Sequence, residues 1–396
     1  MLNEVRKIMR INDKLFTYEL PTKLVYGRGA VARTGEEVAA LGATTVLIAT
    51  DSGVQKAGLL PPVVESLERA GIKVVVYDKV LADSGVDIVN EATQLAKANQ
   101  CDLIVGIGGG SSMDTAKAVA LMVNNSGSIM DYVGMDKFKN DPLPVVAIPT
   151  TAGTGSEVTV WAVINDRENH VKTGIGSTKL MSRVAICDPE LTISLPPRAT
   201  AATGMDALTH AIESYVNTAT QPISEAMAEK SIKLIADNLR LAVANGENVE
   251  ARDGMLMGSL LAALAFNETR LGIAHAWSQP LAAYYPIPHG VANAILLPNV
   301  MEFNLIGNPK KFARIAELIG EQIQGLSLMD AAQKAVDGVR KLMSDIDIPF
   351  HFQEVTTIDE KMIPKIAEDA MQSGNNLVNP HRPDINDLIA ICKKSL

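Results

Sequence analysis

The apolar residues of this chain follow two different rhythms, one before and one after the pair Pro196–Pro197. Before this pair, short runs of β-branched and aliphatic residues alternate with stretches of helical period. The predicted strands cover residues 44–50, 73–77, 103–107 and 144–148, and the predicted helices cover 60–70, 86–99 and 112–123. Strands that are apolar throughout and are separated by helices favour a parallel sheet covered on both faces. The first half is therefore expected to be an α/β, Rossmann-like, doubly wound parallel sheet.

After the two prolines the strand signals disappear. The predicted helices cover residues 199–216, 221–244, 249–266, 272–284, 291–306, 308–320, 328–345 and 359–370. A chain of 396 residues is too long for one ordinary core. Two adjacent prolines stop one element and can start the next helix. We therefore expect two domains, an α/β domain over 1–196 and an all-α helical bundle over 197–396.

The composition narrows the class of protein. A net charge of −9 argues against a nucleic-acid partner, which would favour a basic patch. The cysteines, Cys101, Cys187 and Cys392, are odd in number and widely spaced, so they indicate a reducing compartment rather than a disulfide framework. The start of the chain has no apolar signal region, and no apolar run is long enough to span a membrane. These features predict a cytoplasmic protein that acts on a small molecule.

Two glycine-containing loops follow predicted strands. The run Gly106–Lys117 leaves one strand and opens a helix, where glycines allow close approach of a pyrophosphate and free N–H groups favour anions. Ser111 stands where a strict dinucleotide motif has its last glycine, and a tight turn without a ligand is the alternative. The run Pro149–Glu157 offers hydroxyl groups for phosphate, ribose or nicotinamide-amide contacts, or is an ordinary polar turn. Both loops leave the strand ends at which α/β sheets bind ligands.

Asp51 ends the first clear strand. A carboxylate at this place can accept hydrogen bonds from ribose hydroxyls and would repel a 2′-phosphate, which favours NAD over NADP. The alternative is a turn or helix-cap residue.

Four side chains in the second half suggest a metal site. Asp206 and His210 are four residues apart in a predicted helix, so they share one face. His275 and His289 could complete a mononuclear divalent site, and the window from 206 to 289 holds three of the six histidines of the chain. One carboxylate and three imidazoles do not decide among iron, zinc and manganese.

Together these segments resemble the iron-containing (group III) alcohol dehydrogenases, which share a fold with glycerol dehydrogenase and dehydroquinate synthase. The resemblance runs from Leu24–Gly29 to Asn379–Pro380. Its landmarks are Gly108–Lys117, Pro149–Glu157, Asp188–Leu191, Gly204–Glu213 and Pro288–Asn293. It implies a dehydroquinate synthase-like fold, in which 1–196 is the α/β dinucleotide-binding domain, 197–396 is the all-helical metal-binding and catalytic domain, and the active-site cleft lies between them.

The resemblance also implies roles for individual residues. Metal ligation, and with it catalysis through the metal, is carried onto Asp206, His210, His275 and His289. Fe(II) is the commonest metal in the family, and some members use zinc or manganese. Contacts to NAD(H) are carried onto Asp51, Gly109, Gly110, Ser111, Asp114, Thr150, Thr151 and Lys172. His170, His351 and His381 have no such support and are expected to be surface or structural residues.

The chemistry implied is reversible hydride transfer. A metal would polarise the alcohol or aldehyde oxygen while the nicotinamide lies against the substrate carbon, held by the loop with Thr150 and Thr151. Many relatives carry a second histidine four residues after His275, where this chain has Gln279. Glutamine cannot titrate, so protons would leave through water and ribose hydroxyls, or the substrate differs.

A second departure concerns the substrate. Arg270 stands in a stretch that is small and neutral in many relatives, and Trp161 stands where some carry a small polar residue. We hypothesise that Arg270, with Gln279 and Asn375, binds an anionic group on a short aldehyde, such as a sulfonate or phosphonate, in a pocket that Trp161 and Phe266 also line. The alternative is a surface arginine paired with Glu268.

Three functions follow from these residues. The first is a metal-dependent, NAD(H)-linked alcohol dehydrogenase or aldehyde reductase. The second is a diol dehydrogenase, acting on 1,3-propanediol or on the pair lactaldehyde and 1,2-propanediol, or a butanol-type dehydrogenase. The third is a catalytically dead nucleotide-binding regulator, against which the intact metal-site residues argue. A homodimer is expected, in which Leu15–Pro21 pairs between subunits as an edge strand.

Overall fold

The computed structural model describes residues 15–166 and 171–396. Its first half contains a six-stranded sheet in which all neighbouring strands are parallel. Across the sheet the order is β1 (Lys23–Tyr26), β9 (Val184–Cys187), β6 (Val145–Pro149), β4 (Leu103–Gly108), β2 (Thr45–Ala49) and β3 (Lys73–Tyr77). A smaller sheet contains β5 (Gly134–Met135), β8 (Val171–Gly176) and β7 (Trp161–Asp166), with β7 and β8 antiparallel.

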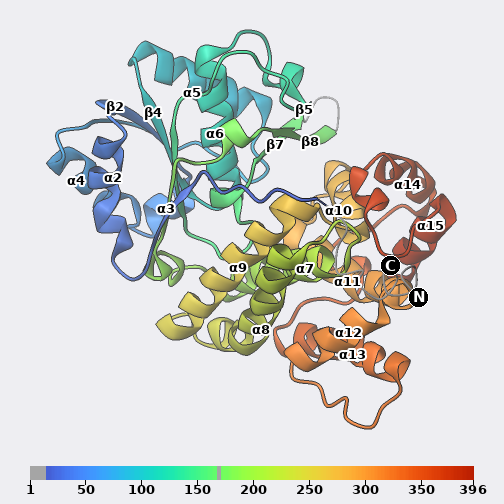
Figure 1. Cartoon of the computed structure of the whole chain (residues 1–396). Helices are drawn as coiled ribbons and strands as arrows, with labels where there is room; N and C mark the ends of the chain where they lie inside the picture. Colours follow the sequence, from blue (N-terminus) through green and yellow to red (C-terminus); the bar gives the residue numbers. More distant parts are fainter. Residues whose placement is uncertain (1–14, 167–170) are drawn as a thin grey trace, which may run out of the picture.

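Helices cover both faces of the six-stranded sheet (Figure 1). These helices are α2 (Thr34–Ala40), α3 (Ser52–Lys56), α4 (Leu60–Arg69), α5 (Val86–Ala98) and α6 (Gly110–Asn124). Alternate residues of β2 point to opposite faces, because side chains alternate along a strand. Ile48 belongs to the core beneath α2 and α4, whereas Leu47 belongs to the core beneath α5 and α6. This arrangement is the predicted doubly wound α/β architecture.

The chain reverses its direction of progress across the sheet between β2 and β4. It moves from β2 outward to β3 and then returns to the other side of β2 as β4. Ligands of open α/β sheets bind at the carboxyl ends of strands beside such a switch point. Asp51 follows β2 and the glycine loop follows β4, so both candidate nucleotide elements lie at this switch point.

The second half of the chain is helical. Its helices are α7 (Pro197–Val216), α8 (Pro222–Ala244), α9 (Val249–Thr269), α10 (Ile273–Tyr284), α11 (His289–Asn304), α12 (Pro309–Leu318), α13 (Leu328–Asp345), α14 (Ile363–Met371) and α15 (Ile385–Lys394). Pro197 is the first residue of α7, a position where its fixed φ suits a helix. We therefore keep 1–196 and 197–396 as the proposed domains.

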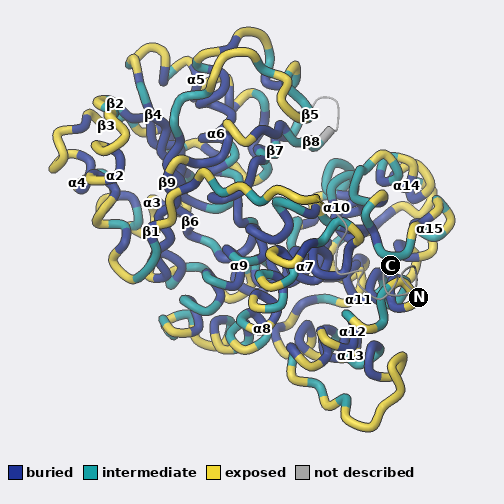
Figure 2. Tube along the Cα trace, viewed as in Figure 1, coloured by how far each residue is buried: buried dark blue, intermediate teal, exposed yellow. Residues whose placement is uncertain are grey.

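The two halves are in close contact (Figures 1 and 2). Tyr26 of β1 donates a hydrogen bond to the Asp253 carboxylate of α9 at 2.8 Å. Gly155 has a φ of 63°, and a side chain there would collide with Ala263 of α9. The loop after β6 therefore packs directly against the helical half, and Figure 2 shows buried residues on both sides of this contact.

Four strands and most helices agree with the sequence predictions, but several elements were not predicted. The missed strands are β1, β5, β7, β8 and β9, and the missed helices include α2, α3 and α15. Leu15–Pro21 lies in no strand of the single chain, whose first strand begins at Lys23. An extended segment needs a partner to be a strand, so the expected pairing between subunits stays a prediction. No helix in the described parts of the chain is both long and apolar enough to cross a membrane.

Candidate metal and nucleotide site

The four predicted metal ligands converge at one place. Asp206 and His210 lie on α7, His275 lies near the start of α10, and His289 is the first residue of α11. The Oδ1 atom of Asp206 lies 3.9, 3.7 and 3.9 Å from the Nε2 atoms of His210, His275 and His289. Asp206, His210 and His275 are buried, and the His289 side chain is 26% exposed. Asp206, His210 and His275 offer ligand atoms within 4.8 Å of one another, and with His289 approaching Asp206 they fit a mononuclear divalent ion.

Hydrogen bonds fix two of the imidazole rings in the orientation that a metal needs. The Nδ1 atom of His275 lies 2.7 Å from the Glu213 carboxylate, and the Nδ1 atom of His210 lies 3.2 Å from the carbonyl oxygen of Gly153. With Nδ1 donating to these acceptors, each Nε2 keeps its lone pair free for a metal. Glu213 also accepts a hydrogen bond from the amide of Ala274 at 2.7 Å, so it is held in place itself.

The sequence interpretation missed Glu213 and Asn293. Glu213 is three residues after His210 on α7, and Asn293 is four residues after His289 on α11. Both spacings place a polar side chain on the ligand-bearing face of a helix. That spacing was the available signal, but it identifies such residues only once the ligands are known.

The electrostatics of the cluster favour neutral ligands at two positions. Burial lowers the pKa of His210 to about 4 and that of His289 to about 3. Burial also disfavours the charged form of His275, but its interactions with Asp206 and Glu213 outweigh burial and raise the pKa to about 9. Burial of Asp206 is likewise outweighed by the three histidines, which hold the pKa of its carboxyl well below the usual range. The neutral form of His275, with Nδ1 donating to Glu213, is the form that can act as a metal ligand.

The two predicted nucleotide loops face each other. Gly109 and Gly110 open α6, and a side chain at Gly110 would lie 2.8 Å from Thr154 of the second loop. Gly109 faces Thr151 at ordinary contact distance. The start of α6 presents backbone N–H groups at the switch point of the sheet, which suits a pyrophosphate.

The remaining predicted cofactor residues already have partners within the chain. Asp51 caps α3 and accepts hydrogen bonds from Gly53, Val54 and Ser112, so the cap role named as the alternative is present. Ser111 accepts a hydrogen bond from the Asp83 amide, and Lys172 forms an ion pair with the Asp83 carboxylate. The Asp114 carboxylate accepts hydrogen bonds from the Ser156 hydroxyl and the Val163 amide. The Thr150 amide donates to the Gly108 carbonyl. Their contacts with NAD(H) stay a prediction.

A fully buried lysine joins the two nucleotide loops. The Nζ atom of Lys117, on α6, donates to the carbonyl oxygens of Ser156, Thr159 and Trp161 at 2.6, 2.8 and 2.8 Å. Glu157 is also fully buried, and burial raises the pKa of its carboxyl to about 7. Lys117 therefore holds the segment that leads from the second loop to β7.

The residues proposed to contact substrate lie only partly together. Trp161, Phe266 and Arg270 line one cavity of about 320 Å³, whose other lining residues include Glu19 and Glu268. The Phe266 ring packs on the His210 ring with centroids 4.5 Å apart, so this cavity is one side chain away from the metal ligands. Gln279 and Asn375 are not among its lining residues.

Arg270 has an unusual backbone. It ends α9 with φ 65° and ψ −171°, a region that is essentially restricted to glycine. A Cβ atom added at Gly374 would lie 2.5 Å from Nη1 of Arg270. The guanidinium therefore lies against the segment that holds Asn375. Arg270 is exposed, as the alternative of a surface arginine expects, but within residues 15–166 and 171–396 no ion pair joins it to Glu268.

The other histidines lie elsewhere. His381 bonds the Phe303 carbonyl through Nδ1 at 2.8 Å and stacks on the Phe303 ring, as expected for a structural residue. His351 is exposed, and His170 lies outside the described residues.

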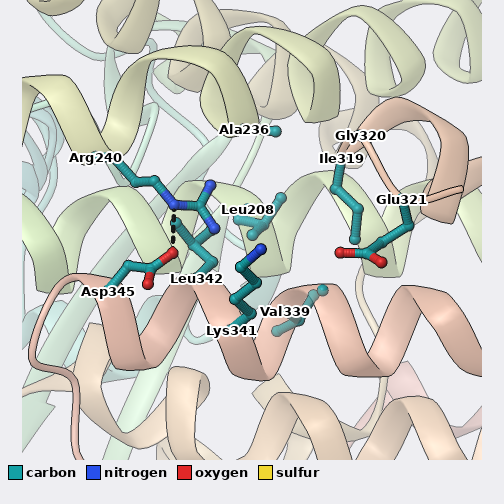
Figure 3. A pocket seen from close by; sticks show the side chains of 11 residues that line it. Leu208, Ala236, Arg240, Ile319, Gly320, Glu321, Val339, Lys341, Leu342 and Asp345 are labelled. Carbon is teal, nitrogen blue, oxygen red and sulfur yellow. Dashed lines mark hydrogen bonds and ion pairs between the residues drawn. The ribbon is translucent and has the colours of Figure 1, made fainter.

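A second cavity, of about 220 Å³, lies among α7, α8 and α13 and does not share residues with the metal site (Figure 3). Arg240 and Asp345 form an ion pair of 2.7 Å there, and Lys341 and Glu321 also line it. None of its lining residues is a predicted ligand, cofactor contact or substrate contact, so we assign it no part in the candidate site.

Comparisons with known proteins agree with these observations. Residues 21–189 match the family model described as iron-containing alcohol dehydrogenase, and residues 200–396 match that of the Fe-containing alcohol dehydrogenase family, C-terminal. The chain is 43% identical to choline dehydrogenase of Bacillus subtilis (strain 168), over 95% of this chain and 93% of the relative. It is 38% identical to sulfoacetaldehyde reductase of Bilophila wadsworthia (strain 3_1_6), over 94% and 97%. A solved structure of 1,3-propanediol oxidoreductase superposes with a TM-score of 0.94 at 42% identity, covering 97% of this chain and 100% of that one.

Proposed function

This chain belongs to the iron-containing alcohol dehydrogenase family, and from that premise we propose that it catalyses reversible hydride transfer between NAD(H) and a short-chain alcohol or aldehyde. The family uses NAD(H) and a divalent metal. One observation carries the proposal for this chain: the proposed ligand His210 is bonded through Nδ1 to Gly153 of the second nucleotide loop. This hydrogen bond joins a proposed metal ligand to the loop that also carries the proposed nicotinamide contacts Thr150 and Thr151.

The proposed metal site would consist of four ligands and two groups that orient them. Asp206, His210, His275 and His289 would hold the ion, and Fe(II) is our first choice. The ion, when bound, supplies Lewis-acid polarisation of the substrate oxygen. The Glu213 carboxylate and the Gly153 carbonyl keep two imidazole rings oriented, which preserves the geometry through the reaction.

The segment that carries Thr150 and Thr151 would orient the nicotinamide. Lys117 holds the residues that follow this segment, because its ammonium group donates to three carbonyl oxygens within residues 156–161. Phe266 lies against His210 and shields one side of the ligand cluster from water. Exclusion of water strengthens the polarisation of the substrate oxygen.

The finer proposal concerns the substrate, for which we favour a short aldehyde with an anionic group, such as sulfoacetaldehyde or phosphonoacetaldehyde. Arg270 supports it, because this residue lines the cavity beside Phe266 and its guanidinium has no carboxylate partner among the described residues. Its strained backbone also costs about 1–3 kcal/mol, and such strain tends to persist where function needs it. A relative with 38% identity bears the name sulfoacetaldehyde reductase.

A second candidate is an alcohol with a cationic group. The same cavity contains the carboxylates of Glu19 and Glu268, and burial, with the nearby Glu19, raises the pKa of Glu268. The rings of Trp161 and Phe266 also line it, and aromatic rings attract quaternary ammonium groups. A relative with 43% identity bears the name choline dehydrogenase.

Charged and uncharged aldehydes of similar size separate these proposals. We would measure kcat/KM with NADH for sulfoacetaldehyde, phosphonoacetaldehyde, butyraldehyde, 3-hydroxypropionaldehyde and betaine aldehyde, using wild type, Arg270→Ala and Glu268→Gln. If the favoured proposal is right, Arg270→Ala loses about tenfold or more on the two anions, as for a lost hydrogen bond to a charged group, and changes little on butyraldehyde. Equal loss on charged and uncharged aldehydes would remove Arg270 from substrate recognition.

The other outcomes are equally informative. A loss confined to betaine aldehyde in Glu268→Gln would favour the cationic substrate. A preference for 3-hydroxypropionaldehyde that neither variant alters would favour a diol dehydrogenase. Absence of turnover with every aldehyde in the metal-loaded wild type would favour a regulatory protein.

A further inference from the structure

Asn293 occupies the middle of the proposed ligand cluster. It lies on α11, one turn after His289, and its side chain is fully buried. Its Nδ2 atom lies 2.8 Å from Oδ1 of Asp206, 2.9 Å from Nε2 of His275 and 3.2 Å from Nε2 of His289. The side chain thus contacts the coordinating atoms of three of the four proposed ligands.

These three acceptor atoms face one another, and without an ion they need a hydrogen-bond donor between them. With both rings neutral, as metal binding requires, each directs lone-pair density at the same small space, and the carboxylate is buried, so the arrangement is unfavourable without a donor. The amide of Asn293 supplies two hydrogens there. Its Oδ1 atom has no hydrogen-bond partner within the described structure, so the contacts of this amide are all on the ligand side.

Two effects of this amide on metal binding oppose each other. An ion would take the lone pairs of His275 and His289, so the amide would lose its contacts with these neutral rings. With two hydrogens for three acceptors, it makes at most one good bond to a ring. Its bond to the Asp206 carboxylate is charge-assisted and roughly twice as strong, and it can persist beside an ion. Orientation of Asp206 should therefore outweigh competition with the ion.

We propose that Asn293 is a positioning residue of the metal site, which orients Asp206 and keeps His275 and His289 gathered around it before an ion binds. This inference rests on the proposed function, since it concerns the same site. Asn293 does not itself ligate the ion in this proposal. Partners that orient ligands in this way are typically worth about 10- to 100-fold in metal affinity.

The chain offers a matched control on the same helix. Asn299 also lies on α11. Its side-chain amide donates a hydrogen bond to Oγ of Ser395 at 2.9 Å, and Ser395 is not one of the proposed ligands. Asn293→Ala and Asn299→Ala each remove one amide from α11, but only the first removes a donor from the ligand cluster.

Co(II) is a suitable probe, because its visible absorption reports on coordination independently of activity. The full-length protein would be stripped with a chelator and titrated with Co(II) in competition with that chelator. We expect about 10- to 100-fold weaker binding for Asn293→Ala and binding within about twofold of wild type for Asn299→Ala. Circular dichroism would check that both variants are folded.

The outcomes separate this inference from the proposed function. Wild-type affinity in a folded Asn293→Ala variant would overturn the role of Asn293 while leaving the metal site intact. Tighter binding would also overturn it, because competition would then dominate. If Asp206→Ala binds Co(II) as tightly as wild type, the ion is bound elsewhere and the proposed metal site itself fails. If Asn293→Ala is unfolded, Asn293→Ser, which retains a small donor, replaces it, and an affinity between those of wild type and Asp206→Ala is expected.

Discussion

The backbone of Arg270 lowers the stability of the protein, whereas its side chain is proposed to serve substrate recognition. Its φ of 65° and ψ of −171° suit glycine, whereas its guanidinium is proposed to recognise substrate. Arg270→Gly and Arg270→Ala both remove the guanidinium, but only glycine relieves the backbone strain. We expect Arg270→Gly to exceed Arg270→Ala in free energy of unfolding by about 1–2 kcal/mol, because the strain of about 1–3 kcal/mol is offset by the greater entropy of unfolded glycine. Denaturant unfolding would measure the difference, and equal stability of the two variants would contradict the assigned strain.

Single residues of the site were predictable to different degrees. Asp206 and His210 follow from helical spacing, because one turn of a helix brings them together. His275 and His289 are far along the chain, so the gathering of three of the six histidines in one window only suggested them, and the resemblance to a family assigned them as ligands. The partners of these ligands, Glu213 and Asn293, depend on how three helices meet. The conformation of Arg270 depends on tertiary contacts, so nothing in the local sequence indicates it.

At the scale of elements, Lys117 couples α6 to the loop that precedes β7. Replacing it by methionine leaves three buried carbonyl oxygens without this donor, at about 1 kcal/mol or more each. We expect Lys117→Met to lower the free energy of unfolding by on the order of 3 kcal/mol and to raise the KM for NADH, because the second nucleotide loop loses its support. Lys97→Met, on the exposed side of α5, is the control and should change the free energy of unfolding by less than about 0.5 kcal/mol. A Lys117→Met variant as stable as this control would show that the buried ammonium does not hold the loop.

The elements that the sequence predicted are those whose apolar pattern is continuous. β2, β3, β4 and β6 are central or long enough to give such runs, and all four are strands in the structure. β1 and β9 are four residues each and pair with each other near the edge of the sheet, so they depend on contacts between distant segments. The segment Leu15–Pro21 belongs to no strand in the single chain, and a homodimer through this region stays a prediction.

At the scale of the whole molecule, the division into an α/β half and a helical half was predictable because the rhythm of apolar residues changes at Pro196–Pro197. How the halves meet was not predictable from that rhythm. It depends on close contacts such as Gly155 against Ala263, and on the bond from His210 to Gly153. These contacts set the proposed metal ligands beside the nucleotide loops, which is the basis of the proposed function.

The most direct test is to follow NADH oxidation with butyraldehyde while the metal is removed and restored under anaerobic conditions. The wild type should lose activity with its metal and regain it in proportion to Fe(II) bound, up to one ion per chain. Asp206→Ala should neither bind the ion at that site nor regain activity. Full activity in the metal-stripped wild type, or equal recovery in Asp206→Ala, would contradict a catalytic metal at Asp206, His210, His275 and His289.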